Sequence, residues 1–155
     1  MDAIDREILS ALQSDGRMSM TELADSIRMS LSSCHRRVRE LERSGLISGY
    51  RAIVDAGRVD LEFEALVFVT MAGADRTILA EFEAAVEDLD HILEAKRLFG
   101  DPDYLLRVVS RDLTSFQRYY DEHLSSLPGV HRLRSTLVMK TLVDDRPLPL
   151  VRART

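Results

Sequence analysis

The N-terminal part of the chain carries hydrophobic residues at helical spacing. Ile4, Ile8 and Leu12 recur every four residues, which places them on one face of a predicted first helix. Asp2 precedes this segment as a capping residue, and the turn-forming pair Asp15-Gly16 follows it. The pattern therefore predicts an amphipathic helix that buries a single hydrophobic stripe.

Two more helices are predicted before Gly45. Ser19 and Glu22 have the spacing of a capping box, in which each side chain binds the other residue's backbone amide at the start of a helix. Ser30 is a capping residue for a third helix that ends before Gly45. The hydrophobic side of this third helix consists of Leu31, Cys34, Val38 and Leu41. Residues 46–54 then alternate enough to predict a strand or a small wing.

The third helix carries a basic side opposite its hydrophobic side. Two helices joined by a tight turn, the second rich in arginine, are typical of proteins that insert a helix into the major groove of DNA. Small hydroxyl side chains permit close approach, and arginine side chains reach phosphates or guanine edges. A solvated helix face is the alternative, which the preceding helices disfavour. The predicted DNA-binding residues are Ser30, Ser32, Ser33, His35, Arg36, Arg37, Arg39 and Arg43. Arg51 in the wing is a further candidate for a phosphate contact.

The second half of the chain has the pattern of a sheet with two helices. The predicted strands are residues 63–71, 91–99, 104–110 and 130–142. Hydrophobic residues at helical spacing predict one helix around Phe82 and another around Phe116. The order βαββαβ predicts a ferredoxin-like sandwich, so the whole chain belongs to the α+β class with an N-terminal helix-turn-helix of winged-helix type.

These elements divide the chain into four parts. We expect a helix-turn-helix domain over residues 1–50, a linker strand over 51–61 and the ferredoxin-like domain over 62–142. The tail, residues 143–155, has no clear period and two prolines. We expect it to lie extended over a partner or to be partly disordered, and we assign it no function.

Charge and composition narrow the function. The net charge of −5 excludes a generally basic nucleic-acid binder, so affinity for DNA must come from a local patch, and residues 28–51 hold six arginines against two glutamates. The single cysteine excludes an internal disulfide. The histidines are scattered along the sequence, so we expect no metal site, and we expect no cofactor. We find no signal-peptide pattern and no apolar run of membrane-spanning length, so we expect a cytoplasmic protein without a membrane partner.

Motifs in both halves resemble the Lrp/AsnC (feast/famine) family of transcription regulators. In the first half the resemblance rests on Ile4-Asp5, Ile8-Leu9, Asp15-Gly16-Arg17, Leu23-Ala24, Ser30, Ser32, Arg37-Val38, Leu41-Glu42, Gly45, Ile47 and Gly49-Tyr50. In the second half it rests on Gly100, Asp101, Asp103-Tyr104, Leu127-Pro128-Gly129-Val130 and Ser135-Thr136. The resemblance implies a sequence-specific DNA-binding regulator, not an enzyme, that responds to a small effector, expected to be an amino acid. It also implies a homodimer, often assembled further into a tetramer or an octamer.

The same resemblance implies that residues 62–142 bind the effector and form the oligomer. The residues implied to contact the effector are Gly100, Asp101, Asp103, Tyr104, Ser135 and Thr136. The carboxylates would pair with an α-amino group, the hydroxyls would bind a carboxylate, and the glycine would let the backbone approach the ligand. The alternative is a tight hairpin turn, which needs Gly, Asp and Pro for its own geometry.

Two residues depart from the family's pattern. Arg28 stands in the turn before the third helix, where glycine is common, and this puts the geometry of that turn in question. Phe99 stands before Gly100, where a small polar residue is common. Its ring either narrows the effector pocket or packs within the strand.

Two rival functions remain. Decarboxylases of haem precursors resemble this family, and His91 and His131 are the histidines of the second half that such an enzyme would use. A DNA-organising protein without an effector would use the same arginine-rich helix, with steep salt dependence and little sequence preference. The basic third helix favours a DNA-binding function over the enzyme.

Overall fold

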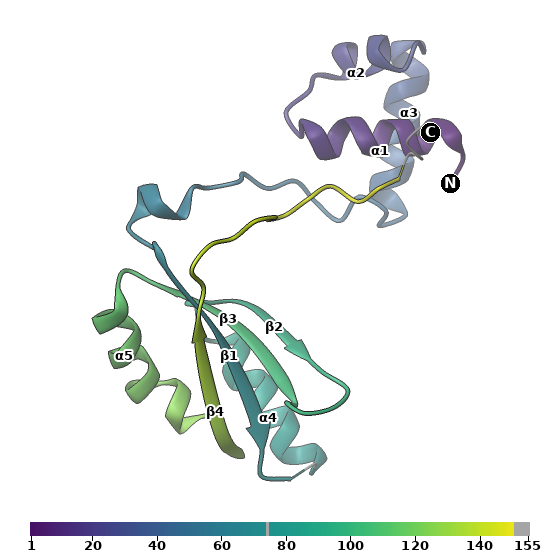
Figure 1. Ribbon diagram of the computed structural model, residues 1–155. Coiled ribbons are helices and arrows are strands. Elements are labelled where there is room, and N and C mark those ends of the chain that lie inside the picture. Colours follow the sequence, from purple (N-terminus) through teal and green to yellow (C-terminus); the bar gives the residue numbers. More distant parts are fainter. Residues whose placement is uncertain (74, 151–155) are drawn as a thin grey trace. The chain divides into compact units, whose positions relative to one another are not determined.

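The computed structural model describes residues 1–73 and 75–150 (Figure 1). The chain divides into two compact units: residues 1–53 together with 142–150 form the first, and Val54–Thr141 forms the second. Within the described residues, no helix is both long enough and apolar enough to cross a membrane.

The first unit consists of the three predicted helices, α1 (Ala3–Ser14), α2 (Met20–Ser26) and α3 (Leu31–Arg43). Asp2 and Ser19 form capping boxes with Asp5 and Glu22, so the free backbone amides at the starts of α1 and α2 are bound by side chains. Ser30 caps α3 by accepting a hydrogen bond from the amide of Ser33. These caps confirm the helix starts that the sequence predicts.

The hydrophobic stripes of the three helices meet in one core. It consists of Ile8, Leu9, Leu12, Leu23, Ala24, Cys34, Val38 and Leu41. Leu31 was predicted on the core side of α3, yet it is exposed because it is the first residue of the helix and lies beyond this cluster. Burial raises the pKa of the Cys34 thiol, consistent with a packing role for this side chain.

The segment after α3 is not the strand or wing that the sequence predicts. Residues 46–55 form no regular element, and a 3₁₀ turn, Ala56–Val59, occupies the middle of the predicted linker strand 51–61. A strand is stabilised by hydrogen bonds to a neighbouring strand. Within the described part of the chain, all four strands pair with one another in the second unit. Residues 46–54 therefore have no neighbouring strand with which to form hydrogen bonds, despite their alternating pattern.

The second unit has the predicted βαββαβ order. Its elements are β1 (Phe63–Met71), α4 (Arg76–Glu87), β2 (Ile92–Arg97), β3 (Tyr104–Ser110), α5 (Leu113–Glu122) and β4 (Val130–Leu137), with a 3₁₀ turn at Leu124–Ser126. The strands form one sheet in the order β2-β3-β1-β4, and every pair is antiparallel. This is the ferredoxin-like arrangement expected from the sequence.

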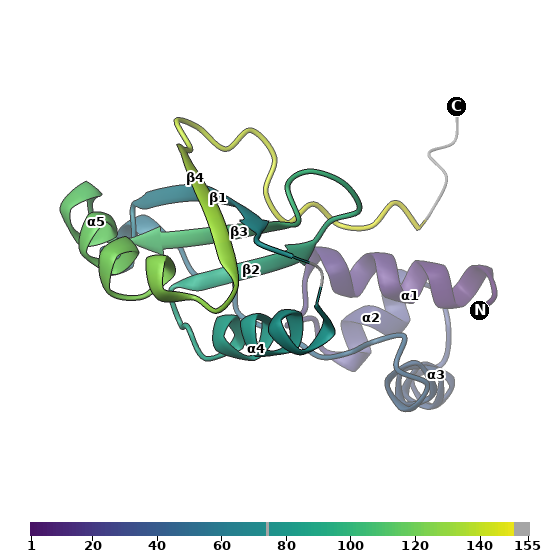
Figure 2. The same ribbon diagram turned by 90° about the horizontal axis from the view of Figure 1, so that it is seen from below.

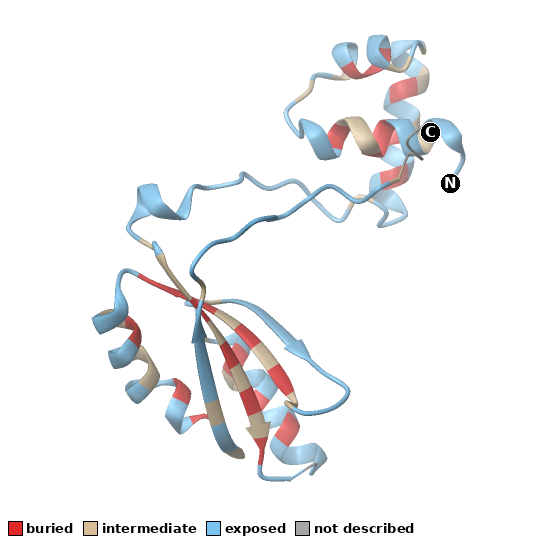
Figure 3. Cartoon of the chain, viewed as in Figure 1, coloured by how far each residue is buried: buried red, intermediate tan, exposed pale blue. Residues whose placement is uncertain are grey.

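Both helices of the second unit cover the same face of the sheet (Figure 2). Side chains from α4 and α5 pack against alternate residues of the central strands, among them Val67 and Leu106. The residues between them, such as Leu66 and Phe68, point to the opposite face and stay partly exposed (Figure 3). We call the latter the open face of the sheet.

Two strands are shorter than predicted. β4 ends at Leu137 rather than 142, and β2 covers Ile92–Arg97 rather than 91–99. The ladder of β4 ends where its partner begins, because Leu137 lies opposite Ala65 and the amide of Val138 donates to the carbonyl of Glu64 near the start of β1.

Gly129 lets the chain turn from α5 into β4. Its φ is +68°, and a Cβ at this position would lie 2.1 Å from Cγ2 of Ile78 on α4. A side chain here would therefore clash with α4 and strain the backbone at once. Helix α5 has already ended at Glu122, and the 3₁₀ turn Leu124–Ser126 lies between it and Gly129.

The described part of the tail belongs to the first unit. Leu148 is hydrogen-bonded to Gln13 on α1, and Leu150 is partly buried against the hydrophobic core of the first unit. The sequence predicts a tail that is extended over a partner or partly disordered; in its described part the tail has no regular element and makes hydrogen-bonding and apolar contacts with its own chain. Residues 151–155 of the predicted tail lie outside the described residues.

Candidate functional site

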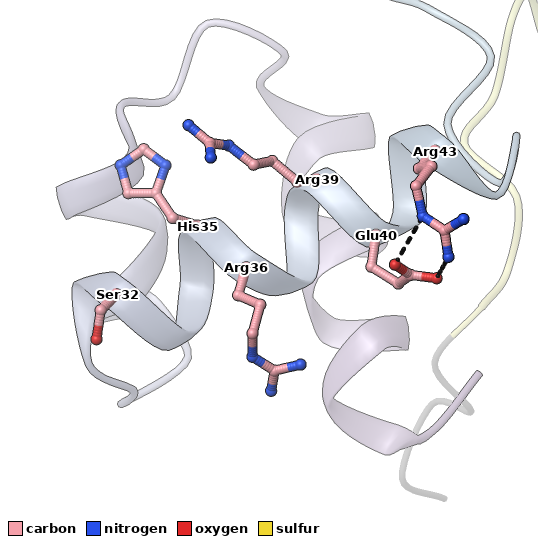
Figure 4. Close-up of a pocket in the computed structure, with 6 residues that line it drawn as sticks. All are labelled: Ser32, His35, Arg36, Arg39, Glu40 and Arg43. Carbon is pink, nitrogen blue, oxygen red and sulfur yellow. Dashed lines mark hydrogen bonds and ion pairs between the residues drawn. The ribbon is translucent and has the colours of Figure 1, made fainter.

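Helix α3 presents a continuous polar surface on the side away from the core (Figure 4). We call this surface the outer face of α3, and it consists of Ser32, His35, Arg36, Arg39, Glu40 and Arg43. Each of these residues has another member of the set three or four positions away, and these are the spacings that share a helix face. The buried residues of α3 hold the helix by its other side, so the outer face is held on a rigid element.

The arginines of the outer face differ in their partners. Arg43 donates from Nε and from its terminal guanidinium nitrogen to the two carboxylate oxygens of Glu40, at 3.1 and 2.7 Å. This hydrogen-bonded pair lowers the pKa of Glu40 and raises that of Arg43. Arg36 and Arg39 form no ion pair with any described residue, so their charges are available to an external anion.

Arg37 has a structural contact that the sequence did not reveal. Its guanidinium lies 2.8 Å from a carboxylate oxygen of Asp2 and 2.7 Å from one of Asp5, and its side chain is only 24% exposed. These pairs tie α3 to the start of α1. The backbone amide of Asp5 lowers the pKa of Asp2, and the Arg37 guanidinium adds to that effect.

The remaining two predicted DNA-binding residues lie at the start of α3. Ser30 accepts from the amide of Ser33, and its hydroxyl donates to the Ser33 hydroxyl at 2.9 Å. Both serines therefore contribute to the cap, and Ser33 is partly buried. Ser32, His35, Arg36, Arg39 and Arg43 are the predicted residues that the structure brings together on the outer face.

The turn between α2 and α3 keeps its shape despite Arg28. This residue takes the left-handed conformation, with φ of +54°, that glycine adopts more easily. The next amide, that of Met29, donates to the carbonyl of Ala24 at 2.9 Å and closes the turn. An arginine thus occupies the glycine position at a local cost of roughly 1 kcal/mol in backbone strain.

In the second unit, Asp103 and Tyr104 point into the protein. The Asp103 carboxylate accepts a hydrogen bond from the amide of Met71 at 2.8 Å, which anchors the 98–103 turn to the end of β1. Tyr104 is 3% exposed and donates its hydroxyl to Glu83 on α4 at 2.7 Å. Burial, followed by the adjacent Glu83 carboxylate, raises the pKa of Tyr104 to about 12. Asp103 and Tyr104 therefore fix the position of the turn through contacts with β1 and α4.

Asp101 lies instead on the open face of the sheet. Together with its neighbours it lines a hollow of about 130 Å³, which we call the sheet hollow. The lining residues are Phe68, Thr70, Asp101, Pro102, Arg132 and Arg134. The Arg134 guanidinium lies 4.8 Å from the centre of the Phe68 ring, a cation–π distance. One carboxylate and two guanidinium groups thus share a small site beside Gly100.

The two hydroxyl residues predicted on the last strand do not share a face. Ser135 lies opposite Val67, whose side chain is in the core under the helices, whereas Thr136 lies opposite Leu66 on the open face. Only Thr136 is on the same face as Arg134 and the sheet hollow.

Sequence analysis did not name five of the residues that line the sheet hollow: Phe68, Thr70, Pro102, Arg132 and Arg134. The alternation of Arg132 and Arg134 in a predicted strand was a signal that both point to one face. What that face contacts depends on the pairing of β4 with β1, which brings Arg134 opposite Phe68 and Arg132 opposite Thr70.

The histidines considered for an enzyme lie apart. His91 immediately precedes β2, and its Nδ1 is 2.8 Å from the carbonyl oxygen of Val109. His131 is on β4, and β2 and β4 are the opposite edges of the sheet. They do not converge on one reacting position. Among the described residues, no group of three or more His, Cys, Asp or Glu is placed to hold a metal ion.

Comparison with known protein families gives two matches along the chain. Residues 1–48 match a winged helix-turn-helix DNA-binding domain. Residues 64–148 match the Lrp/AsnC ligand binding domain. The matched regions correspond to the unit with the outer face of α3 and to the unit with the sheet hollow.

Whole-chain comparisons agree with these matches. The chain is 38% identical over 148 residues to the leucine-responsive regulatory protein of Salmonella typhimurium, covering 96% of this chain and 90% of that protein. Its fold matches a transcriptional regulator of Neisseria meningitidis solved in complex with L-Met, with a TM-score of 0.92, 31% identity and 97% of each chain covered. An AsnC family regulator from Agrobacterium tumefaciens matches with the same TM-score and coverage at 29% identity.

Proposed function

Because the chain belongs to the Lrp/AsnC family of transcription regulators, we propose that α3 reads DNA through its outer face and that an amino acid bound in the sheet hollow controls this binding. The function as a DNA-binding regulator follows from the family. The assignment to particular residues rests on the geometry of the two surfaces.

The outer face of α3 suits a DNA duplex in charge and shape. The whole chain is acidic, with a net charge of −5, yet this face holds three arginines and a histidine beside one glutamate. Arg36 and Arg39 lie near the middle of the helix without acidic partners among the described residues, so they can bind phosphates or guanine edges. Ser32 precedes them and leaves room for the groove wall.

The sheet hollow suits a free amino acid because it holds charges of both signs. The carboxylate of Asp101 can pair with an α-ammonium group, and the guanidinium groups of Arg132 and Arg134 can bind an α-carboxylate in a bidentate manner. Phe68 supplies an apolar surface beside them. The relative from Neisseria meningitidis, solved in complex with L-Met, supports this ligand class.

This placement revises how the predicted effector residues would act. Asp101 and Thr136 are on the open face, whereas Asp103 and Tyr104 support the turn from within and Ser135 points toward the helices. Gly100, with φ of +138°, lets the turn bend back beside the hollow. We assign direct contacts to Asp101, Arg132 and Arg134.

We further propose that the protein acts as a homo-oligomer in the cytoplasm. The open face carries partly exposed Leu66, Phe68 and Leu105, and a second copy would bury them. A symmetric dimer would present two α3 helices to the two halves of a pseudo-palindromic site. Light scattering coupled to size-exclusion chromatography tests this; a monomer at micromolar concentration would count against it.

The test of the main proposal is a binding measurement on the full-length protein. A DNA sequence is first selected by the protein from a random library, and its affinity is compared by fluorescence anisotropy with that of a scrambled sequence at the same salt concentration. The measurement is repeated with an equimolar mixture of the twenty amino acids. We expect preferential binding that changes with the mixture. Equal affinity for both sequences and no response would favour a DNA-organising protein without an effector.

A further inference from the structure

The last described residues of the chain return to the DNA-binding unit after β4. The backbone amide of Leu148 donates to Oε1 of Gln13 at 2.7 Å, and Nε2 of Gln13 donates to the Leu148 carbonyl at 3.3 Å. The side-chain amide of one residue on α1 thus satisfies both backbone groups of one residue in the tail. A neighbouring strand in a sheet would make the same pair of bonds.

The sequence around Leu148 fixes which residue Gln13 can bind. Pro147 and Pro149 have no amide hydrogen, so Leu148 is the single donor in this stretch. A residue that precedes proline is also biased toward an extended backbone. In this conformation the amide and carbonyl groups of Leu148 are accessible to a hydrogen-bonding partner beside the chain. The two prolines therefore present Leu148 to α1 in one register.

Two further contacts hold the same segment. Leu150 is partly buried against the hydrophobic core of the first unit. Asp145 forms an ion pair with Arg51, which follows α3 in the chain. The segment 142–150 therefore contacts the DNA-binding unit at three separated points, and we call it the strap.

The docked strap adds a non-covalent link between the helices of the first unit and the chain that leaves the second unit. The chain leaves the first unit after Ile53, forms the second unit and re-enters the first at Leu142. β4 carries Arg132 and Arg134 of the sheet hollow and ends at Leu137, so few residues separate the strap from the strand that lines the hollow. When the strap is docked, both ends of the second unit are tied to the first.

The docked state is weakly held. Its hydrogen bonds are exposed to solvent, its ion pair is at the surface and only one apolar side chain is partly buried. Such contacts compete closely with hydration, so the docked state outweighs the released state by only about tenfold. A ligand shifts an equilibrium of this kind when it binds the two states with different affinity.

We propose that α1 carries a docking surface for this proline-flanked strap, and that its docking transmits occupation of the sheet hollow to the DNA-binding unit. This inference rests on the proposed amino-acid effector. Gln13 acts as a positioning residue, because it holds the strap and belongs neither to the outer face of α3 nor to the sheet hollow.

The variant Gln13→Ala tests the strap in the full-length protein. It removes both hydrogen bonds to Leu148, and alanine at this exposed helical position favours the helix. The matched control is Glu7→Ala, because Glu7 is exposed on α1 and forms no hydrogen bond or ion pair with any described residue. A second pair compares Leu150→Ser with Leu142→Ser, which lies in the strap but is 82% exposed.

Two measurements are made on each variant. Amide hydrogen exchange at Leu148 reports docking directly, and we expect it to be about tenfold faster in Gln13→Ala and Leu150→Ser than in wild type and the controls. Fluorescence anisotropy on the selected DNA, with and without the twenty amino acids, reports signalling. We expect both strap variants to bind this DNA as wild type does but to lose the response to the mixture.

Three results would overturn the inference. Exchange at Leu148 as fast in wild type as in an unfolded peptide would show that the strap does not dock. An unchanged amino-acid response in Gln13→Ala and Leu150→Ser would exclude the signalling role while leaving the proposed function intact. A wild-type protein that ignores every amino acid would instead overturn the proposed function, and the signalling role with it.

Discussion

The outer face of α3 and the sheet hollow are built in different ways. All six residues of the outer face come from one helix of 13 residues. The six residues of the sheet hollow come from β1, from the turn after β2 and from β4. A helix places its own residues at fixed spacing, whereas the hollow exists only when β4 is paired with β1. The first surface is therefore local, and the second depends on the packing of the whole unit.

The two surfaces also differ in how charge is arranged. Arg36 and Arg39 on α3 lack acidic partners among the described residues, which suits a polyanion. The hollow combines two arginines with Asp101, which suits a small molecule that carries both charges. Substitutions that alter either the outer face of α3, which is local, or the sheet hollow, which is assembled from separate strands, test this contrast.

The largest effect is expected from Gly129→Ala, which breaks the assembled surface alone. The added Cβ would clash with Ile78 and strain a backbone with φ of +68°, so we expect a loss of about 3 kcal/mol from the free energy of unfolding of the second unit. Urea denaturation measures this loss. The control Gly73→Ala, with open space around the new Cβ, should change stability by less than about 0.5 kcal/mol. NMR signals of α3 that vanish together with those of the sheet would contradict the separation of the units.

Arg36→Ala breaks the local surface without disturbing the fold. Arg36 is exposed and unpaired within the described chain, so we expect DNA affinity to fall about tenfold or more, a cost of roughly 1–3 kcal/mol. Fluorescence anisotropy on the selected DNA measures it, with Arg118→Ala, an exposed arginine on α5, as the control. Arg37→Ala should behave differently and lower the melting temperature, because it removes the link between α3 and Asp2 and Asp5. Equal affinity of Arg36→Ala and wild type would move the DNA contact elsewhere.

Arg134→Ala tests the assembled surface as a ligand site. We expect amino-acid binding to weaken about tenfold, which corresponds to the loss of one charge-assisted contact, while affinity for DNA without effector stays unchanged. Isothermal titration with each amino acid measures the dissociation constant. Ser135→Ala is the matched control on the same strand, because Ser135 points to the other face. A larger effect from Ser135→Ala than from Arg134→Ala would place the ligand away from the hollow.

Arg28→Gly should have a small, stabilising effect on the first unit. Glycine removes the strain of φ at +54° but gains entropy in the unfolded chain, so the net gain is roughly 0.5 kcal/mol. Thermal unfolding followed by circular dichroism measures it. A loss of stability would show that the arginine side chain makes a compensating contact.

The smallest effect concerns pH and the cap of α5. The backbone amide of Ser115 lowers the pKa of Asp112, so the folded state favours the charged carboxylate. This contribution is present above the ordinary carboxyl pKa of about 3.9 and is lost as pH falls through the lower folded pKa. Asp112→Asn keeps a capping oxygen without a charge, so we expect a slightly lower melting temperature than wild type at neutral pH and a difference that narrows as pH falls below about 4. A parallel acid dependence in both proteins would contradict this.

Much of the fold could be predicted from local patterns. The caps at Asp2, Ser19 and Ser30 depend on residues within one turn of each other, and the structure confirms them together with the part of the α3 stripe from Cys34 to Leu41. The βαββαβ order also follows from the order in which helical and strand-like spacings of hydrophobic residues succeed one another along the chain. The alternation in residues 46–54 misled because a strand depends on a partner, and no described strand lies beside this segment.

The sequence by itself determined the outer face of α3, because 100° per residue fixes which side chains share a helix face. Only the tertiary structure decided which residues surround the sheet hollow, since the pairing of β4 with β1 brings Arg134 to Phe68 across a long stretch of chain. It also decided that Arg37 binds Asp2 and Asp5 and that Leu148 binds Gln13. Contacts between residues far apart in sequence leave no periodic trace, because each depends on how separate elements pack.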